Sequence, residues 1–145
     1  MKPNKEAVSL IITDDTGKFL AVKRADDPND DLAGVWGFPA VTLQGDETHP
    51  DAALKVGRQK LGVEIELGEK VGDSTHDRGR HVLHLTDYKA RIVDGIPQVP
   101  QSDVYVSQYA DCKYSDDPTI LFEAARKGSQ CTQLYLASIG TDWRE

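Results

Sequence analysis

Apolar residues along the chain fall into short runs of strand length, separated by turns rich in Asp, Gly and Pro. Residues 7–13 read AVSLIIT and residues 19–24 read FLAVKR, and both runs favour β-structure. Gly17 lies between them, in a turn that needs a residue tolerant of positive φ. The pattern predicts a β-hairpin over these residues.

The same pattern predicts strands over residues 35–43, 63–71, 81–93 and 104–114. The first of these runs is interrupted at Gly37 and Pro39. Residues 25–34 form a loop rich in Asp, Asn and Pro, and its role is left open.

A helix is predicted over residues 48–61. Thr48 and Asp51 resemble a capping box at its start, and Gly62 is a stop signal at its end. Three residues recur at four-residue spacing and would line the buried face, namely Ala53, Gly57 and Leu61. Glycine inside a helix costs about 1 kcal/mol relative to alanine, so Gly57 indicates either close contact with the sheet or a cavity.

Two further helices are predicted near the C-terminus. Asp116-Asp117-Pro118 caps a helix that continues to Lys127, and residues 129–138 form a last short helix. Strands on both sides of a central helix, followed by more helices, are typical of a mixed sheet with helices on both faces. At 145 residues the chain is expected to be a single domain over residues 1–145.

Charge and hydropathy narrow the classes of partner. The formal net charge of −7 argues against nonspecific nucleic-acid binding and against attachment to an anionic membrane. No apolar run approaches the roughly 18 residues of a membrane-spanning helix, so a cytoplasmic location is expected. Cys112 and Cys131 lack metal-like spacing and are expected to be free thiols.

The segment from Trp36 to Val63 resembles the Nudix family. Trp36-Gly37-Phe38-Pro39 precedes a short strand, then come Gly45-Asp46-Glu47-Thr48, an Ala-Ala pair and Leu61-Gly62-Val63. The family carries a box of the form G-x5-E-x7-R-E-U-x-E-E-x-G-U, where U is a bulky aliphatic residue. The resemblance implies a Nudix-type α/β/α sandwich with a mixed sheet between helices. It also implies metal-assisted hydrolysis of a nucleoside diphosphate linked to another moiety.

Aligned with this box, residues 41–63 keep some of its positions. Glu47 matches the first glutamate, Gly62 and Val63 match the last two positions, and Lys55 stands in place of the arginine. The remaining positions depart from the box, since the chain has Val41, Val56, Gly57, Gln59 and Lys60 there.

These departures remove the expected metal ligands. Positions 56, 59 and 60 would share one face of a regular helix, where three carboxylates could converge on Mg²⁺. At these positions the chain has the isopropyl group of Val56, the amide of Gln59 and the ammonium of Lys60 instead. We therefore expect no metal at this standard site, and Mg²⁺ as a cofactor only if the chain is hydrolytic.

The remaining residues of the box favour ligand binding with little hydrolysis. Lys60 would replace the charge of the metal and meet a phosphate directly, and Gln59 and Arg24 would add contacts. Lys55 would pair with Glu47, the one acid retained and the candidate catalytic residue. The expected partner is a small phosphorylated or nucleotide-like ligand.

Two alternatives stay open. The chain could be an active hydrolase that takes other acidic ligands, with candidates in Asp46, Glu47, Asp103 and Glu123. It could also be a protein–protein interaction domain, and a homodimer is left open. His81 and His84 would point to opposite faces of a strand, which argues against a metal site shared with His76.

Overall fold

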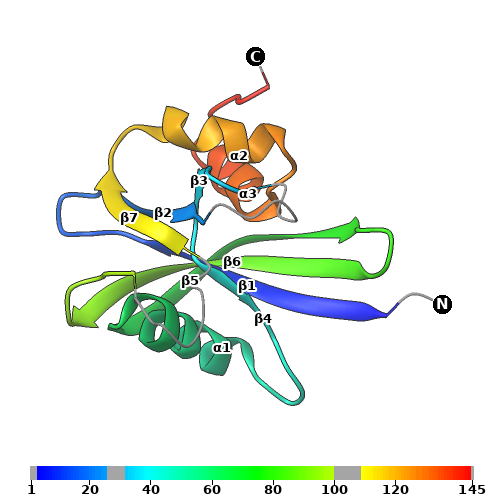
Figure 1. Cartoon of the computed structure of the whole chain (residues 1–145), viewed down its shortest axis with the longest axis horizontal. Helices are drawn as coiled ribbons and strands as arrows, with labels where there is room; N and C mark the ends of the chain where they lie inside the picture. The colour runs from blue at the N-terminus through cyan, green and yellow to red at the C-terminus, as the bar shows by residue number, and fades with distance from the viewer. Residues whose placement is uncertain (1–2, 26–31, 100–108, 145) are drawn as a thin grey trace.

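The computed structural model describes residues 3–25, 32–99 and 109–144, and two β-sheets lie at its centre (Figure 1). The mixed sheet has the order β4 (Ala40–Thr42), β1 (Asn4–Ile12), β6 (Val82–Asp94) and β5 (Glu64–Asp77). The smaller sheet has the order β3 (Trp36–Gly37), β2 (Phe19–Arg24) and β7 (Tyr109–Ser115). Strands β1 and β6 pair in parallel, and the other pairs are antiparallel.

Helices cover both faces of the mixed sheet (Figure 1). On one side lie α1 (His49–Lys55) and the π-helical segment η1 (Val56–Leu61). On the other lie the 3₁₀ turn η2 (Pro118–Leu121), α2 (Phe122–Arg126) and α3 (Gln130–Ser138). This arrangement confirms the α/β/α layering and the mixed sheet that the sequence predicted.

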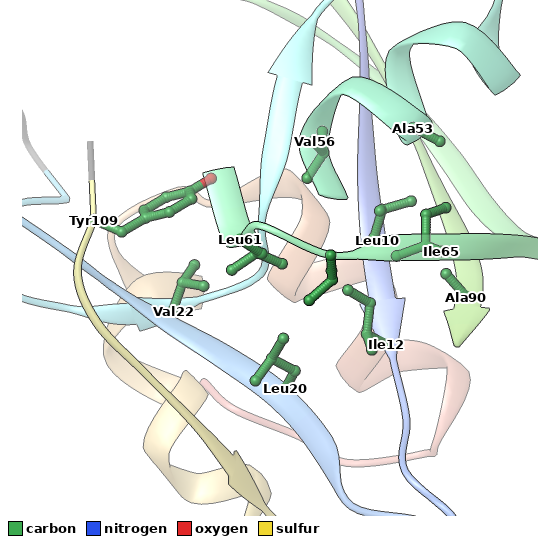
Figure 2. Close-up of a cluster of buried hydrophobic side chains, with 11 residues drawn as sticks. Leu10, Ile12, Leu20, Val22, Ala53, Val56, Leu61, Ile65, Ala90 and Tyr109 are labelled. Carbon is green, nitrogen blue, oxygen red and sulfur yellow. The ribbon is translucent and has the colours of Figure 1, made fainter. Parts of the chain in front are cut away.

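Strands β1 and β2 are buried on both faces, which explains their nearly continuous apolar sequences. Leu10 of β1 and Leu20 of β2 belong to a cluster beneath α1 and η1 (Figure 2). Ile11 and Phe19 belong to a second cluster beneath α2 and α3. The alternation of side chains along each strand therefore joins both helical layers to the sheets.

The predicted hairpin over β1 and β2 was wrong in its pairing. The two strands belong to different sheets, and the structure records between them the bridge Thr13–Phe19. The turn itself forms as expected, with the Asp14 carboxylate accepting from the backbone N–H groups of Thr16 at 2.9 Å and Lys18 at 3.0 Å. Because both strands bury both faces, each pairs with other strands and the chain changes sheet at this turn.

The strand predicted over residues 35–43 is divided between the two sheets. Its first part is β3 and its second is β4, with Pro39 between them. Strand β5 continues to Asp77, past the predicted end at residue 71, because it pairs with β6 along its length. Strand β7 begins at Tyr109, and residues 104–108 of the predicted strand lie outside the described residues.

The predicted helix over residues 48–61 begins as expected but changes winding. The Thr48 hydroxyl accepts from the N–H of Asp51 at 3.2 Å, and the α-helix ends at Lys55. The following turn is π-helical and ends at Gly62, whose φ is 69° and whose N–H donates to the carbonyl of Gly57. A π turn closes i→i+5 hydrogen bonds, so side chains beyond residue 55 do not follow α-helical spacing.

Gly57 marks a close approach of η1 to β5. A Cβ at this position would lie 3.0 Å from the carbonyl oxygen of Val63 and 3.1 Å from Cγ2 of Ile65. Ala53 and Leu61 are fully buried nearby, as predicted. Close contact, and not a cavity, therefore explains a glycine within this helix.

The C-terminal helices begin near the predicted positions. Asp117 accepts from the N–H of Thr119 at 3.0 Å and opens η2, which leads into α2. The predicted single helix is thus a 3₁₀ turn followed by a short α-helix. Within the described ranges, the helices are too short and too polar to span a membrane.

We expect Gly57→Ala to destabilise the protein. The added methyl group would meet backbone and a buried isoleucine, and such overpacking costs about 1–3 kcal/mol. Alanine gains about 1 kcal/mol in helix propensity, so a net loss of up to about 2 kcal/mol in the free energy of unfolding is expected. Urea denaturation measures it. Gln59→Ala, at an exposed position of the same segment, is the control, and equal stability of both variants would contradict the close approach.

Candidate functional site

A pocket of about 370 Å³ lies between the two sheets and reaches the start of α3. Its volume is within the range of about 300–1,000 Å³ that is usual for small-molecule sites. Apolar side chains from both sheets form much of its wall, including Ala7, Val22, Phe38, Leu83 and Leu85. Ser129, Gln130 and Cys131 of α3 close one end. The pocket therefore combines an apolar wall with polar groups at its ends.

The described residues around this pocket carry positive charge. Arg24, Lys60 and Arg78 line it, and none of the described lining residues carries a carboxylate. The chain as a whole has a formal net charge of −7, so the positive charge of the described pocket lining is opposite in sign to that of the chain. A pocket with such a lining favours an anionic ligand.

Lys60 enters the pocket from the end of η1. Its ammonium donates a hydrogen bond to the carbonyl oxygen of Ala40 and lies 5.4 Å from the ring centre of Tyr109. The Tyr109 hydroxyl in turn accepts from the Ala40 N–H at 3.0 Å. Figure 2 shows Tyr109 beside Leu61 and Val22 at the edge of the first hydrophobic cluster. Lys60 thus contacts a neutral acceptor and an aromatic face.

Burial, together with the nearby charges of Arg24 and Lys55, lowers the pKa of the Lys60 ammonium to about 8. Desolvation and like charges both disfavour the charged form of an amine. A bound anion would instead raise the pKa of Lys60, because a nearby opposite charge favours the ammonium form.

Arg24 reaches the pocket from the end of β2, and Arg78 reaches it from just after the end of β5. A register shift between Lys23 and Arg24 interrupts the β2–β7 ladder, and such bulges redirect side chains. Arg78 follows the end of β5 and donates to the side-chain oxygen of Gln130 at 2.5 Å and to the carbonyl of Gly128 at 3.2 Å. Of these two arginines, Arg24 was the one named from the sequence as a candidate ligand contact.

Glu47 and Lys55 form the ion pair expected from the sequence. The Lys55 ammonium lies 2.9 Å from the Glu47 carboxylate, which also accepts from the Gln44 N–H at 2.7 Å. The Lys55 hydrogen bond and the Gln44 N–H lower the pKa of Glu47. Neither residue is part of the pocket lining, so the pair ties the loop to α1 outside the pocket.

The expectation that residues 56, 59 and 60 present one common face was wrong. Val56 is fully buried in the first hydrophobic cluster, Gln59 is exposed, and only Lys60 lines the pocket. The π-helical winding after Lys55 explains the difference, because it breaks the spacing that the prediction assumed.

The other acidic candidates do not gather at the pocket. Asp46 is exposed, and Glu123 lies on α2, where it pairs with Lys127 at 3.3 Å. Helices α1 and α2 lie on opposite sides of the mixed sheet (Figure 1), and Asp103 lies outside the described residues. In the parts of the chain that the structure describes, no three His, Cys, Asp or Glu side chains are grouped to hold a metal ion.

Several residues of the pocket were not found as site residues from the sequence. Phe38 packs edge-on against Tyr135, with the ring centres 5.0 Å apart, and it also lines the pocket. Gln130 and Cys131 are distant in sequence from the box, and only the fold brings α3 to Lys60. The start of a helix after Gly128 was the one available signal for this end of the pocket.

A buried acid lies beneath α3. Asp87 is fully buried and is paired across β1 and β6 with Ser9, whose hydroxyl donates to its Oδ1. Its Oδ2 has no hydrogen-bond partner among the described residues. Burial raises the pKa of Asp87 to about 8, against the opposing effect of the Ser9 hydrogen bond. Burial and the neighbouring Asp87 also raise the pKa of the Cys131 thiol.

Residues 3–116 match the NUDIX domain family. Because this match covers most of the chain, the protein belongs to that family, in agreement with the layered fold around the pocket. Nudix hydrolases generally use Mg²⁺ or another divalent ion. At positions 56, 59 and 60 this chain has no carboxylate, and its Glu47 is paired with Lys55. The described residues of the box therefore do not fit the standard metal site.

Among curated proteins, the chain is 32% identical over 80 residues to the CTP pyrophosphohydrolase of Escherichia coli (strain K12). That match covers 55% of this chain and 57% of the relative, so it spans little more than half of the relative's length.

Two solved structures have the same fold. The E. coli ORF135 protein gives a TM-score of 0.70 at 22% identity, covering 94% of this chain and 91% of the other. The MutT protein from Methanosarcina mazei Go1 also gives 0.70, at 14% identity, covering 96% and 95%.

We expect Asp87→Asn to change how stability depends on pH. The folded protein keeps a proton on Asp87 between about pH 4 and pH 8 that the unfolded chain releases. The resulting stabilisation is complete below pH 4 and is lost as the pH rises through about 8. An amide has no such loss, so the stability of the variant relative to the parent should rise by about 1–3 kcal/mol between pH 5 and pH 8.

Urea denaturation across this pH range tests that expectation. Asp94→Asn, at an exposed position of the same strand, is the control and should follow the parent. Parallel pH profiles for the parent and Asp87→Asn would show that Asp87 does not retain its proton.

Proposed function

We propose that this protein binds a nucleoside diphosphate-type ligand without a metal ion and has little or no hydrolytic activity. The observation that carries the proposal is the position of Lys60 in a pocket whose other described charges are Arg24 and Arg78. An ammonium can meet a phosphate directly as a point charge, whereas the guanidinium groups can bind it in a bidentate manner. In this proposal Lys60 and Arg24 bind substrate phosphates, and Lys55 and Glu47 hold the loop that leads into α1.

The chemistry of the box supports the absence of standard metal chemistry. Mg²⁺ requires oxygen ligands in near-octahedral geometry, and an ammonium in its place repels it. Gln59 offers one amide oxygen at an exposed position, and Val56 offers none. Glu47 would have to leave Lys55 to act as a ligand or a catalytic base.

Hydrolysis remains a second candidate, and the E. coli relative is the observation that favours it. That relative is a CTP pyrophosphohydrolase by name, and its likeness extends over 55% of this chain. An active site here would need acidic ligands other than those of the standard box. CTP is accordingly the nucleotide to test first, beside ADP-ribose.

Metal-free binding should depend on Lys60. With a chelator present, Lys60→Ala should weaken ADP-ribose binding by about 1–3 kcal/mol, the value of a hydrogen bond to a charged group, or roughly 5- to 150-fold. Affinity should also fall by up to about tenfold from pH 7 to pH 9, because Lys60 loses its proton around pH 8. Isothermal titration at two salt concentrations measures both effects.

Arg58→Ala is the matched control, because it removes a cation from the same segment that pairs with Glu64 outside the pocket. Its affinity should equal that of the parent. Undetectable binding by the parent, or equal binding by Lys60→Ala, would refute the proposal and favour an interaction domain.

Nucleotide cleavage should remain at background. CTP, other nucleoside triphosphates, ADP-ribose and dinucleoside polyphosphates should be cleaved no faster than in a Mg²⁺ blank, because the box lacks three of its acids. Titration with Mg²⁺ or Mn²⁺ up to low-millimolar concentrations should give no saturable heat. Phosphate release is the measurement, and turnover that disappears in Glu47→Gln would instead establish the hydrolase alternative.

A further inference from the structure

We propose that the protein has a second ligand site, separate from the pocket that holds Lys60, which takes a small planar ring carrying a phosphate group. A nucleoside monophosphate is a ligand of this class. The site is a pocket of about 260 Å³ lined by side chains of β5, of α3 and of residues 141–144, and we call it the tail pocket. It goes beyond the proposed function and does not depend on it.

The side chain of Gln130 separates the tail pocket from the pocket that holds Lys60. Gln130 is the one residue that the described linings of the two pockets share. Its side-chain oxygen accepts from Arg78 at 2.5 Å, on the side of the Lys60 pocket. Its amide nitrogen donates to the Ser74 hydroxyl at 2.9 Å, on the side of the tail pocket. Because both ends of the amide are held, Gln130 forms a wall between two distinct binding volumes.

An indole gives the tail pocket an aromatic surface. Trp143 is half-buried in the lining, and its carbonyl oxygen accepts from the Arg126 guanidinium at 2.8 Å, which ties this segment to α2. Leu134 and Ala137 of α3 add apolar surface. Every nucleobase has a π-face, so stacking on an aromatic side chain suits many different bases. The apolar part of the lining therefore fits a planar ring.

The charge of the tail pocket favours an anion. Arg144 lines it, and none of the described lining residues carries a carboxylate. The Arg144 guanidinium lies 4.9 Å from the ring centre of Trp143, which places a cation beside the aromatic surface. Its neighbour Asp142 lies 3.9 Å away, and both side chains of this pair are largely exposed. Such a pair contributes little in water, so Arg144 can turn to a phosphate and bind it in a bidentate manner.

Polar groups with no protein partner complete the lining. Over the described ranges, the indole N–H of Trp143, the hydroxyl of Thr141 and the side-chain oxygen of Gln133 make no hydrogen bond to the protein. The imidazole of His76 lies in the same lining. Donors and acceptors together match the edge of a nucleobase, which presents both. The volume is below the usual lower limit of about 300 Å³ for small-molecule sites, so it favours one such ring over a dinucleotide.

AMP is the probe for the tail pocket, on the intact isotope-labelled chain with a chelator present. The chain has two tryptophans, so a proton–nitrogen correlation spectrum should show two indole signals, and Trp143→Phe identifies the signal of Trp143. Trp36 of β3 is outside the described linings of both pockets and is the internal reference. The Trp143 signal should shift saturably at low-millimolar AMP. Adenosine should bind roughly 3- to 10-fold more weakly, because it lacks the phosphate.

Two pairs of variants test the location of the site. Ala137→Glu places a carboxylate in the lining at an exposed helical position and should abolish the shift, whereas Ser138→Glu adds the same charge outside the tail pocket and should bind as the parent does. Arg144→Gln should weaken AMP binding roughly 3- to 10-fold. Arg91→Gln is its matched control, because it removes an exposed cation that pairs with Glu66 outside the tail pocket.

The outcomes separate the second site from the proposed function. An unshifted Trp143 signal in the parent, or a shift that Ala137→Glu leaves unchanged, overturns the second site. A shift that disappears in Lys60→Ala also overturns it, because the signal would then report binding in the Lys60 pocket. Equal affinities for adenosine and AMP would refute the phosphate contact. If the Trp143 shift persists in Lys60→Ala while the parent shows no Lys60-dependent binding of ADP-ribose, the second site stands and the proposed function falls.

Discussion

Burial of β1 and β2 on both faces is the constraint on which the rest of the molecule depends. Each strand gives alternate side chains to the cluster beneath α1 and to the cluster beneath α2 and α3. Neither helical layer could be removed without exposing one side of both strands to water. The same constraint places the mixed sheet and the small sheet side by side, and the pocket lies where they meet the start of α3.

Much of the fold was predictable because local patterns and tertiary packing agree. The apolar runs gave the strands, Thr48 and Asp117 gave helix starts, and the Nudix box gave the layering. The division of residues 35–43 between two sheets was not predictable, since alternation within a run does not identify the partner strand. The π turn was missed for a related reason, because it occurs where Gly57 approaches β5, a contact between segments that local spacing does not reveal.

The site was only partly predictable from the sequence. Lys60 and Arg24 do line the pocket, whereas Gln59 is exposed and Glu47 and Lys55 pair outside it. The partners at the other end, Arg78 and Gln130, are separated from the box by whole strands. Sequence patterns report neighbours along a helix or a strand, and only the folded chain brings residues 24, 60, 78 and 130 around one volume.

The π turn has a consequence for how insertions and deletions affect this protein. A π turn holds one more residue than an α turn. Side chains in residues 56–61 therefore point in directions that differ from those of a continuous α-helix. Removal of one residue between Lys55 and Lys60 would allow α-helical winding and leave the lysine near its present angle. With all residues kept, α-helical winding would rotate the lysine about the helix axis by roughly one residue step, about 100°. Its amine would then leave the carbonyl of Ala40, so in this chain the winding of one turn determines which side chain faces the pocket.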